Sequence, residues 1–582
     1  MGTVTPLTNN GEIASYPFWL TANAQQLELT YAQLDRLAAG TNAGRRVTVP
    51  TGVGFCLYLR RALLEGVGVL DEQLFGRGYG EENDLCLRAE AAGWRNVVLG
   101  DTFVRHFGGV SFGAAKGKSV KRGVRRVEHR HPGYPQRIQQ TMAADPLRAI
   151  RARLDAARWR RHFALTPDAR PVSLFVLHHQ GGGTWVHAEQ LAARLIAAGR
   201  RVVFLVPDGL RPGTVDLLWA APAETAQDGE LTFNPAGTPV APNLRAFELN
   251  RDRDALVAAC RSLGVDHLHV HHVTGFGPAA PAWAAAFAER LDVATDVTLH
   301  DYAAICPRLH CHDETGRYCG LPALAGCESC IASRGALVET PSVWLWRRQW
   351  ADLLRQARRV FAPSAGLAET IARYVPDARV TVQPHFDTLD GIAAVPPDAP
   401  TGSAGVRQVA LFGVIGDHKG YNLLLELARD ARRRALPLAF TVIGYTRDDA
   451  RLERAGVSVT GPYRRDAVSA HVRRLQPEVA LFLSLWPETY CYTLSEALAC
   501  EIFPVAVDLG APAERLRALG WGALIPFAET RSPARINDRL CQLTVTPPPP
   551  AVRERRWVVS YPSILADYYG FETPAQASPG AE

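Results

Sequence analysis

Two glutamates, Glu488 and Glu496, follow the apolar run EVALFLSLW. The run predicts a strand, so Glu488 falls in the turn after it and Glu496 lies near the start of the next helix, facing a cleft. Free backbone amides at that helix start, around Tyr492 and Thr493, suit a diphosphate. Glu496 can then accept the two hydroxyls of a ribose, and Glu488 can hold hydroxyls of a sugar. The competing interpretation is a surface turn residue and a carboxylate that only stabilises the helix start.

A second turn, VIGDHKG, contributes glycines and a lysine after the strand-like run RQVALFG. Gly413 and Gly416 permit close approach of the backbone, and Lys419 can reach a phosphate. Glycine-rich turns before helices are common, so this turn alone does not identify a ligand. Together with the two glutamates, it predicts a site for a diphosphate that links a ribose to a sugar.

These turns belong to a region, from about 171 to 527, in which short apolar runs alternate with helical patterns. That alternation is typical of parallel sheets flanked by helices. One set of runs ends near His385, and a second begins at Arg407, with the Pro- and Ala-rich stretch IAAVPPDAPTGSAG as the linker between them. The sequence therefore predicts an α/β fold with two Rossmann-like domains in tandem, whose ligand binds at the carboxyl ends of the strands, between the domains.

The region 170–530 resembles glycosyltransferase family 4, the retaining enzymes with the two-domain GT-B fold. The resemblance is most specific in PETYCYTLSEALA and is supported by FGVIGDHKG and HHQGGGTWVHAEQLA. It implies a nucleotide-sugar donor, a glycan or lipid-linked glycan acceptor, and no cofactor at this site. The implied catalytic residues are Glu488, Lys419 and His300, and the implied donor-binding residues are Gly182, Gly183, Thr184, Gly413, Gly416, Lys419, Glu488, Tyr492, Thr493 and Glu496.

By this resemblance Glu496 binds the ribose, Glu488 the donor sugar and Lys419 the diphosphate. Many family members have an arginine a few residues before the lysine, but this chain has Ile415, Gly416 and Asp417 there. One phosphate-binding cation is therefore expected to be missing. Retention in this fold is attributed to attack by the acceptor hydroxyl on the face from which the diphosphate departs, so catalysis depends on phosphate stabilisation and orientation.

Two further features come from the first domain. The loop Gly181–Thr184 matches the one that the family places over the donor phosphates, although a purely structural turn is the alternative. His300, followed by Asp301, matches a histidine that contacts the reacting sugar, and His187 and His271 are weaker candidates. A hydrogen-bonded structural histidine at a strand end is the competing interpretation of His300.

The N-terminal region, residues 47–113, closely resembles the acceptor half of a family 2 glycosyltransferase with the GT-A fold, above all in GYGEENDLCLRAEAAGW. The resemblance implies that Glu82 is the general base, Asp84 its neighbour, and His106 a residue that completes a metal site. The nucleotide-binding half, with its Asp-x-Asp, would precede Met1. We therefore expect a vestigial family 2 site that serves as a scaffold or acceptor platform, or a fragment of a bifunctional enzyme.

Five of the eleven cysteines lie in CPRLHCHDETGRYCGLPALAGCESC. Cys306, Cys319, Cys327 and Cys330 are candidate ligands of a structural zinc ion, and reduced or disulfide-linked thiols are the alternative. A metal–sulfur redox protein built on this cluster is a competing interpretation of the whole chain.

Composition limits the partners. The net charge is +6, and the segment 116–131 is rich in lysine and arginine. A solvated linker is expected there, with contact to anionic lipid as the alternative, and no nucleic-acid recognition motif accompanies the charge. Because the sequence shows no secretory signal and no apolar run long enough to cross a bilayer, we expect a cytoplasmic protein, peripheral to the inner membrane face.

The predicted order is a partial GT-A module at 1–115, a basic linker and connecting helix at 116–168, an acceptor-side Rossmann-like domain at 169–392, a nucleotide-sugar-side domain at 400–530 and an extension at 531–582. The predicted activity is transfer of a sugar from a nucleotide-sugar to a glycan, with retention, in cell-surface polysaccharide biosynthesis. A noncatalytic glycan-assembly subunit is the alternative from another class.

Overall fold

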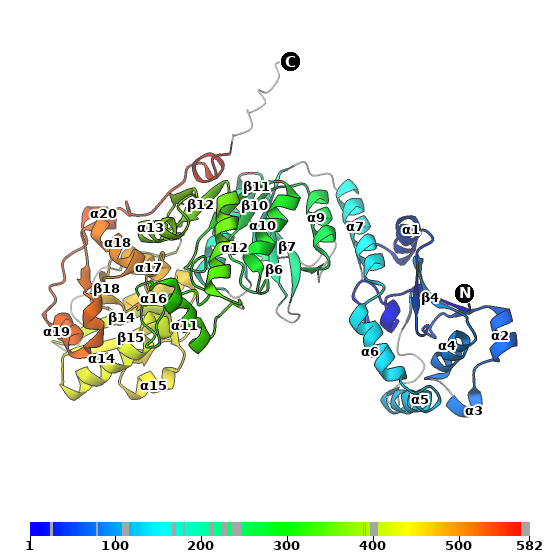
Figure 1. Cartoon of the computed structure of the whole chain (residues 1–582). Helices are drawn as coiled ribbons and strands as arrows, with labels where there is room; N and C mark the ends of the chain where they lie inside the picture. Colours follow the sequence, from blue (N-terminus) through cyan, green and yellow to red (C-terminus); the bar gives the residue numbers. More distant parts are fainter. Residues whose placement is uncertain are drawn as a thin grey trace, which may run out of the picture. The chain divides into compact units, whose positions relative to one another are not determined.

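The computed structural model describes residues 1–23, 27–76, 79–107, 116–165, 170–178, 181–208, 213–222, 231–233, 247–338, 340–387, 389, 391–395 and 405–571. The middle of the expected interdomain linker, 396–404, lies outside these residues. The chain forms two compact units (Figure 1), the first made of Met1–Ala169 with Ala236–Gly264 and the second of Arg170–Pro235 with Val265–Glu582.

The first unit is built on a small mixed sheet in the order β2-β4-β1-β3. Strand β1 runs parallel to β4, while β2 and β3 are antiparallel edge strands. Leu147, Ile150 and Leu154 are buried against β1 and β4, because one apolar face of their helix covers the sheet. The elements are β1 (Thr3–Leu7), η1 (Glu12–Ala14), α1 (Tyr31–Thr41), β2 (Arg46–Val49), β3 (Tyr58–Leu59), α2 (Arg61–Val67), α3 (Glu72–Phe75), α4 (Glu81–Ala91), β4 (Asn96–Phe103), α5 (Lys116–Arg130), α6 (Tyr134–Ala144), α7 (Arg148–Leu165), β9 (Phe247–Glu248) and α9 (Arg253–Ser262).

The basic segment 116–131 is helical along most of its length, as α5. Val127 on this helix is buried in one cluster with Phe75, Leu87 and Tyr134. The exposed side of α5 carries cations, but the opposite side is packed.

The second unit begins with a sheet in the order β13-β12-β11-β10-β5-β6-β7-β8. Neighbours from β13 to β6 are parallel, and β7 and β8 extend the sheet antiparallel. Its elements are β5 (Val172–Val176), α8 (Gly182–Ala197), β6 (Arg201–Pro207), β7 (Thr214–Pro222), β8 (Leu231–Phe233), β10 (Val265–Val270), α10 (Ala280–Leu291), β11 (Ala294–Thr298), α11 (Leu324–Arg334), α12 (Val343–Gln356), β12 (Arg359–Ala362), α13 (Ala365–Tyr374) and β13 (Val380–Val382).

A second, fully parallel sheet follows in the order β16-β15-β14-β17-β18-β19. The α/β class, with two tandem Rossmann-like domains after a separate α/β module, is confirmed. The elements of this domain are β14 (Arg407–Ile415), η3 (Asp417–Lys419), α14 (Tyr421–Arg433), β15 (Leu438–Thr446), α15 (Asp449–Arg454), β16 (Ser458–Val459), η4 (Arg465–Ala467), α16 (Val468–Leu475), β17 (Val479–Phe482), α17 (Tyr492–Ala499), β18 (Phe503–Val507), α18 (Gly510–Leu519), β19 (Ala523–Ile525), η5 (Phe527–Arg531) and α19 (Pro533–Gln542).

The C-terminal extension returns to the first Rossmann-like domain of this unit. It contains α20 (Pro550–Arg553) and the short η6 (Ile564–Tyr568). Tyr568 and Tyr569 are fully buried in the same apolar cluster as Phe175 of β5 and Phe204 of β6. The extension is therefore part of that domain's core. No helix in the described ranges is both long enough and apolar enough to cross a membrane.

Candidate active site

One cavity of ≈ 750 Å³ lies at the carboxyl ends of the strands of both Rossmann-like domains. The residues predicted from the sequence to be catalytic or donor-binding all line it, which the chain order alone does not require. They are Gly182, Gly183, Thr184, His300, Gly413, Gly416, Lys419, Glu488, Tyr492, Thr493 and Glu496.

Glu488 lies in the turn between β17 and α17 and is almost fully buried. Its Oε2 lies 3.9 Å from Nζ of Lys419, and the hydroxyl of Ser484 donates a hydrogen bond to Oε1. The charge of Glu488 raises the pKa of Lys419. The cavity thus holds a lysine that stays protonated and a carboxylate fixed in orientation by a serine.

Glu496 lies on the second turn of α17, one face of which borders the cavity. Tyr463 donates a 2.6 Å hydrogen bond from its hydroxyl to Oε2, and Nε of Arg465 lies 3.2 Å from Oε1. Burial raises the pKa of Glu496, and the charge of Arg465 acts against that rise. The carboxylate is therefore held by a hydroxyl on one oxygen and a cation on the other.

Arg465 was not singled out in the sequence. It follows the short strand β16 in GPYRRDA. Ligands bind beyond the carboxyl ends of parallel strands, so this position after a strand is the signal that could have identified it. Its guanidinium lines the cavity and lies 3.4 Å from the buried carboxylate of Asp387. Asp387 in turn accepts hydrogen bonds of 2.7 Å from Tyr490 and 2.8 Å from Ser495. These contacts hold a second cation in a cavity where an arginine before Lys419 is absent.

Glycines bring the walls of the cavity together. Gly413 has φ +89°, and a Cβ there would lie 2.9 Å from Cγ2 of Thr493. A Cβ on Gly183 would lie 3.7 Å from the ring of Tyr492. Gly182 and Gly183 form the first turn of α8, and residues 179–180 just before it lie outside the described residues. The turn of β14 and the start of α8 thus approach the start of α17 from opposite domains.

His300 follows β11 and forms part of the cavity wall. Thr489 donates a 2.5 Å hydrogen bond to its carbonyl oxygen, and Nδ1 of His271 lies 3.1 Å from its Nε2. Burial lowers the pKa of His300 well below its ordinary value, and nearby His385 lowers it further. His300 is therefore a neutral ring at physiological pH. His187 and His271 are buried behind it.

A further wall consists of aromatic rings. His310 stacks on His418 with ring centroids 4.8 Å apart, and Trp486 meets His310 edge-on at 4.8 Å. Burial lowers the pKa of His418 to about 3. This wall is therefore uncharged, and flat apolar faces of this kind suit the carbon face of a sugar ring.

The predicted zinc ligands do not assemble. Cys306, Cys319, Cys327 and Cys330 are free thiols, and nowhere in the described chain do three or more His, Cys, Asp or Glu side chains stand in an arrangement that could hold a metal ion. A hydrogen bond from Cys311 lowers the pKa of Cys306 to about 7. The four cysteines are free thiols in this structure, and a structural zinc ion on this cluster stays a prediction.

In the first unit, the predicted family 2 residues occupy two separate environments. Asp84 is completely buried, with its carboxylate 2.8 Å from both Arg88 and His131 and 3.4 Å from Arg130. Glu82 lies beside Gly54, where a Cβ on the glycine would be 3.6 Å from its carboxyl carbon, and burial raises its pKa.

His106 approaches the same turn as Glu82. Its ring stacks on Phe55 with centroids 5.1 Å apart, and Phe55 follows the glycine that faces Glu82. Glu82 and His106 thus both lie beside one turn, residues 54–55. Asp84 instead forms ion pairs that connect α4 to the end of α5 and to His131.

Three family models match the chain. "Glycosyltransferase like family 2" matches residues 2–128, "Glycosyl transferase 4-like domain" matches 182–385, and "Glycosyl transferases group 1" matches 403–544. No curated protein sequence matches the chain.

Solved structures resemble it remotely. Sucrose-phosphate synthase from Thermosynechococcus elongatus is 14% identical, with a TM-score of 0.41, covering 64% of this chain and 90% of that one. HepE from Anabaena, in complex with UDP-glucose, is 13% identical with a TM-score of 0.40, covering 68% of this chain and 93% of that one. A glycosyltransferase from Rickettsia africae is 14% identical with a TM-score of 0.40, covering 64% and 88%. Nothing about ligands follows from likenesses this remote.

Proposed function

We propose, from the premise that this chain is a glycosyltransferase with a family 2-like domain followed by a family 4-like and a group 1 domain, that its second unit transfers a sugar from a nucleotide-sugar to a glycan with retention. One observation carries the proposal. A single cavity holds Lys419, Glu488 and Glu496 beside the first turn of α17. These are the groups that a diphosphate, a sugar and a ribose need, in one place.

The diphosphate would bind between Lys419 and the free amides of Tyr492 and Thr493. Lys419 keeps its proton because Glu488 raises its pKa, and the amides carry the positive end of the helix dipole. Arg465 supplies a second positive charge from another loop of the same domain. As the bond to the sugar breaks, negative charge grows on the phosphate, and cations already in place stabilise it without reorganisation. We propose that these cations make a divalent metal unnecessary here.

The donor sugar would lie between Glu488 and His300. Glu488 is fixed by Ser484 and Lys419, so its carboxylate can accept sugar hydroxyls in one orientation. His300 is neutral and can hydrogen-bond a hydroxyl without adding charge. The acceptor would enter beside the aromatic wall of His310 and Trp486. Its hydroxyl would attack from the face that the diphosphate leaves, the bond from the sugar to the diphosphate would break, and the hydroxyl proton would pass to the departing diphosphate. No protein nucleophile is then required, and orientation provides much of the rate.

The domain limits that we propose are those read from the sequence, 1–115, 116–168, 169–392, 400–530 and 531–582. We propose that Glu82, Asp84 and His106 are a vestigial family 2 site and that the first unit is an acceptor platform. The eleven free thiols favour a reducing compartment, and the cations of α5 favour a place beside an anionic membrane. The proposed setting is therefore the cytoplasmic face of the inner membrane, in polysaccharide biosynthesis.

The test is a panel of UDP-, GDP- and ADP-sugars, scored for transfer by the full chain, with NMR of the product to read its anomeric configuration. Glu496→Ala should abolish transfer, because the ribose loses its ligand. Glu478→Ala, a change at a half-exposed glutamate that does not line the cavity, is the matched control. Equal turnover by Glu496→Ala would remove the site assignment. A wild-type chain inactive with every donor would favour the noncatalytic assembly subunit, and an inverted product would exclude retention.

A further inference from the structure

The first Rossmann-like domain of the second unit contains a ladder of polar side chains across β10 and β11. Alternate residues of a strand face the same side, so His-x-His-x-His, which begins on β10, meets Asp-x-Thr-x-His, which begins on β11. The last histidine of each pattern, His271 and His300, lies just after its strand. The three rungs are His267 with Asp296 at 3.1 Å, His269 with Thr298 at 2.8 Å, and His271 with His300 at 3.1 Å. The last rung ends at the cavity.

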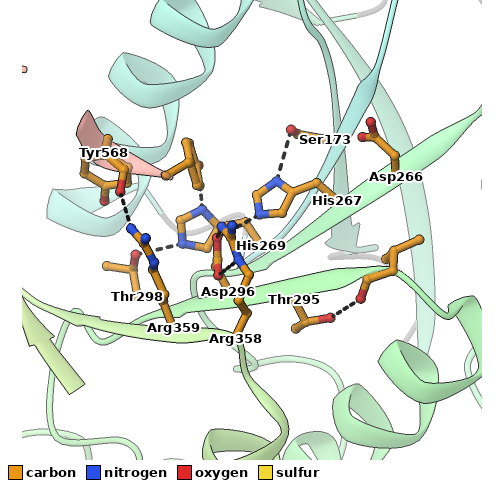
Figure 2. Close-up of polar contacts among 12 residues, drawn as sticks. Ser173, Asp266, His267, His269, Thr295, Asp296, Thr298, Arg358, Arg359 and Tyr568 are labelled. Atoms are coloured by element: carbon orange, nitrogen blue, oxygen red, sulfur yellow. Dashed lines mark hydrogen bonds and ion pairs between the residues drawn. The ribbon is translucent and has the colours of Figure 1, made fainter. Parts of the chain in front are cut away.

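The first two rungs are anchored on both ring nitrogens (Figure 2). Ser173 lies 3.1 Å from Nδ1 of His267, and Nε of Arg358 lies 3.0 Å from the carboxylate of Asp296. The hydroxyl of Tyr569, from the C-terminal extension, lies 2.8 Å from Nδ1 of His269. These rungs form a rigid base, and the ring of His269 lies 4.0 Å from that of His271.

In the third rung one ring nitrogen of His271 has no hydrogen-bond partner among the described residues. Nδ1 of His271 faces Nε2 of His300, while Nε2 of His271 is buried and has no hydrogen-bond partner within the described part of the chain. Burial lowers the pKa of both rings well below the ordinary value, so each ring carries a single proton. Either His271 donates to His300, or the reverse.

The two possible directions of this hydrogen bond leave the unpartnered Nε2 of His271 in different states, protonated or bare. If His300 donates, His271 must carry its proton on Nε2, which is then a buried N–H without an acceptor. If His271 donates, the unpartnered nitrogen is a bare acceptor. Buried N–H groups without partners are rarer than under-satisfied acceptors, which favours donation by His271. His300 then carries its proton on Nδ1, the ring nitrogen that His271 does not occupy.

We propose that His271 is a positioning residue, which holds His300 as a neutral Nδ1–H donor toward a hydroxyl of the bound sugar. The proposal rests on the proposed function for the identity of the sugar, and it extends that function inward to a residue that touches no substrate. It also explains the register of the ladder, since a shift by one residue would turn the His271 ring to the other face of the sheet.

The first experiment needs no substrate. The full chain labelled with ¹⁵N-histidine gives ring-nitrogen shifts that distinguish the two neutral tautomers, and the signals of His300 are those lost in His300→Ala. We expect the Nδ1–H form in the wild type and in His271→Asn, whose amide keeps an N–H donor on that side. We expect His271→Phe to lose this preference. A wild-type His300 protonated on Nε2, or an unchanged tautomer in His271→Phe, overturns the proposal.

The second experiment uses the donor found in the panel. His271→Phe should lower kcat roughly 10-fold to 100-fold with little change in the KM of the donor, because a misplaced group costs rate more than binding. His271→Asn should recover most of the loss. Thr298→Val removes the neighbouring rung and is the matched control, with kcat kept and Tm lowered. Equal kcat in His271→Phe and the wild type contradicts the proposal. Absence of turnover in the wild type contradicts the proposed function instead. The ¹⁵N measurement of the His300 tautomer then tests the role of His271 by itself.

Discussion

Carboxylates stand near the start of α4 in the first unit and of α17 in the second, yet their surroundings differ. Asp84 is fully buried and has three basic partners, two of them from the end of the α5 segment and one from its own helix. Glu496 borders a cavity, and its partners Tyr463 and Arg465 come from a loop beyond a strand end. A carboxylate near a helix start is therefore a buried structural anchor in the first unit and borders a cavity in the second.

The comparison teaches that a position beside a cavity, rather than the acidic residue itself or its partners, distinguishes Glu496 from Asp84. Asp84 is fully buried, and each of its carboxylate oxygens has a basic partner, Arg88 on one and His131 on the other. Glu488 accepts a hydrogen bond from Ser484 and lies 3.9 Å from Nζ of Lys419, and both Glu488 and Lys419 line the cavity.

The largest expected effect on activity concerns Lys419, one of the cations that line the cavity. Lys419→Met removes a charge that, under the proposed function, stabilises the departing diphosphate, so kcat should fall about 10³-fold. Glu82→Gln, at the acidic cluster of the first unit, should leave the rate of the same reaction within about twofold, since we propose that this cluster is a vestigial site. Both are measured by initial rates with the donor from the panel. A larger loss of rate in Glu82→Gln than in Lys419→Met would contradict the assignment of the active site to the second unit.

Acid should act on the two units in opposite directions. In the second unit burial lowers the pKa of His187, His271, His300 and His385, so the unfolded chain takes up these protons first as pH falls below about 6.5. Each such histidine should cost about 1 kcal/mol of stability one pH unit lower. In the first unit burial raises the pKa of Asp155 to about 6, so the folded state gains protons and stability over the same range.

Scanning calorimetry between pH 7.5 and 5.5 tests whether the stabilities of the two units change in opposite directions. The transition of the second unit should move to lower temperature, and that of the first should hold or rise. Parallel movement of both transitions would contradict the linkage argument.

The anchor of the first unit gives the next largest effect. Asp84→Ala leaves Arg88, Arg130 and His131 without their common carboxylate, and the loss should be about 3 kcal/mol. The same calorimetric scan should show one transition lowered and the other unchanged, which also assigns the transitions to the units. Glu90→Ala, which breaks an exposed pair with Arg137, should cost less than about 1 kcal/mol and is the control.

The smallest expected effect is at Glu496, the proposed ligand of the ribose. Tyr463→Phe removes one hydrogen bond to Glu496, so the donor KM should rise about threefold to tenfold while kcat changes little. Tyr445→Phe, at a partly exposed tyrosine elsewhere on the cavity wall, is the matched control. A fall in kcat with constant KM would instead place Tyr463 in the chemical step.

Much of the fold could be read from the sequence because buried parallel strands are continuous apolar runs. The two runs that precede the predicted site turns, RQVALFG and EVALFLSLW, correspond to the strands Arg407–Ile415 and Val479–Phe482. The turns after those runs contain Lys419 and Glu488, and His300 follows β11, so the candidate site followed from strand ends. The helix at 116–130 replaced an expected linker, because Val127 found apolar partners that lie far away in sequence.

The sequence by itself determined the order of strands and helices and the positions of the charged residues in the turns, since both depend on local periodicity. Only the tertiary structure decided which charges meet. Arg465 reached the cavity, Asp387 became its anchor, and Asp84 became a buried ion pair through contacts across long sequence separations. The His271–His300 rung likewise arose from the register of β10 with β11. Hydrogen bonds and ion pairs act over a few ångströms, and only folding brings such residues that close.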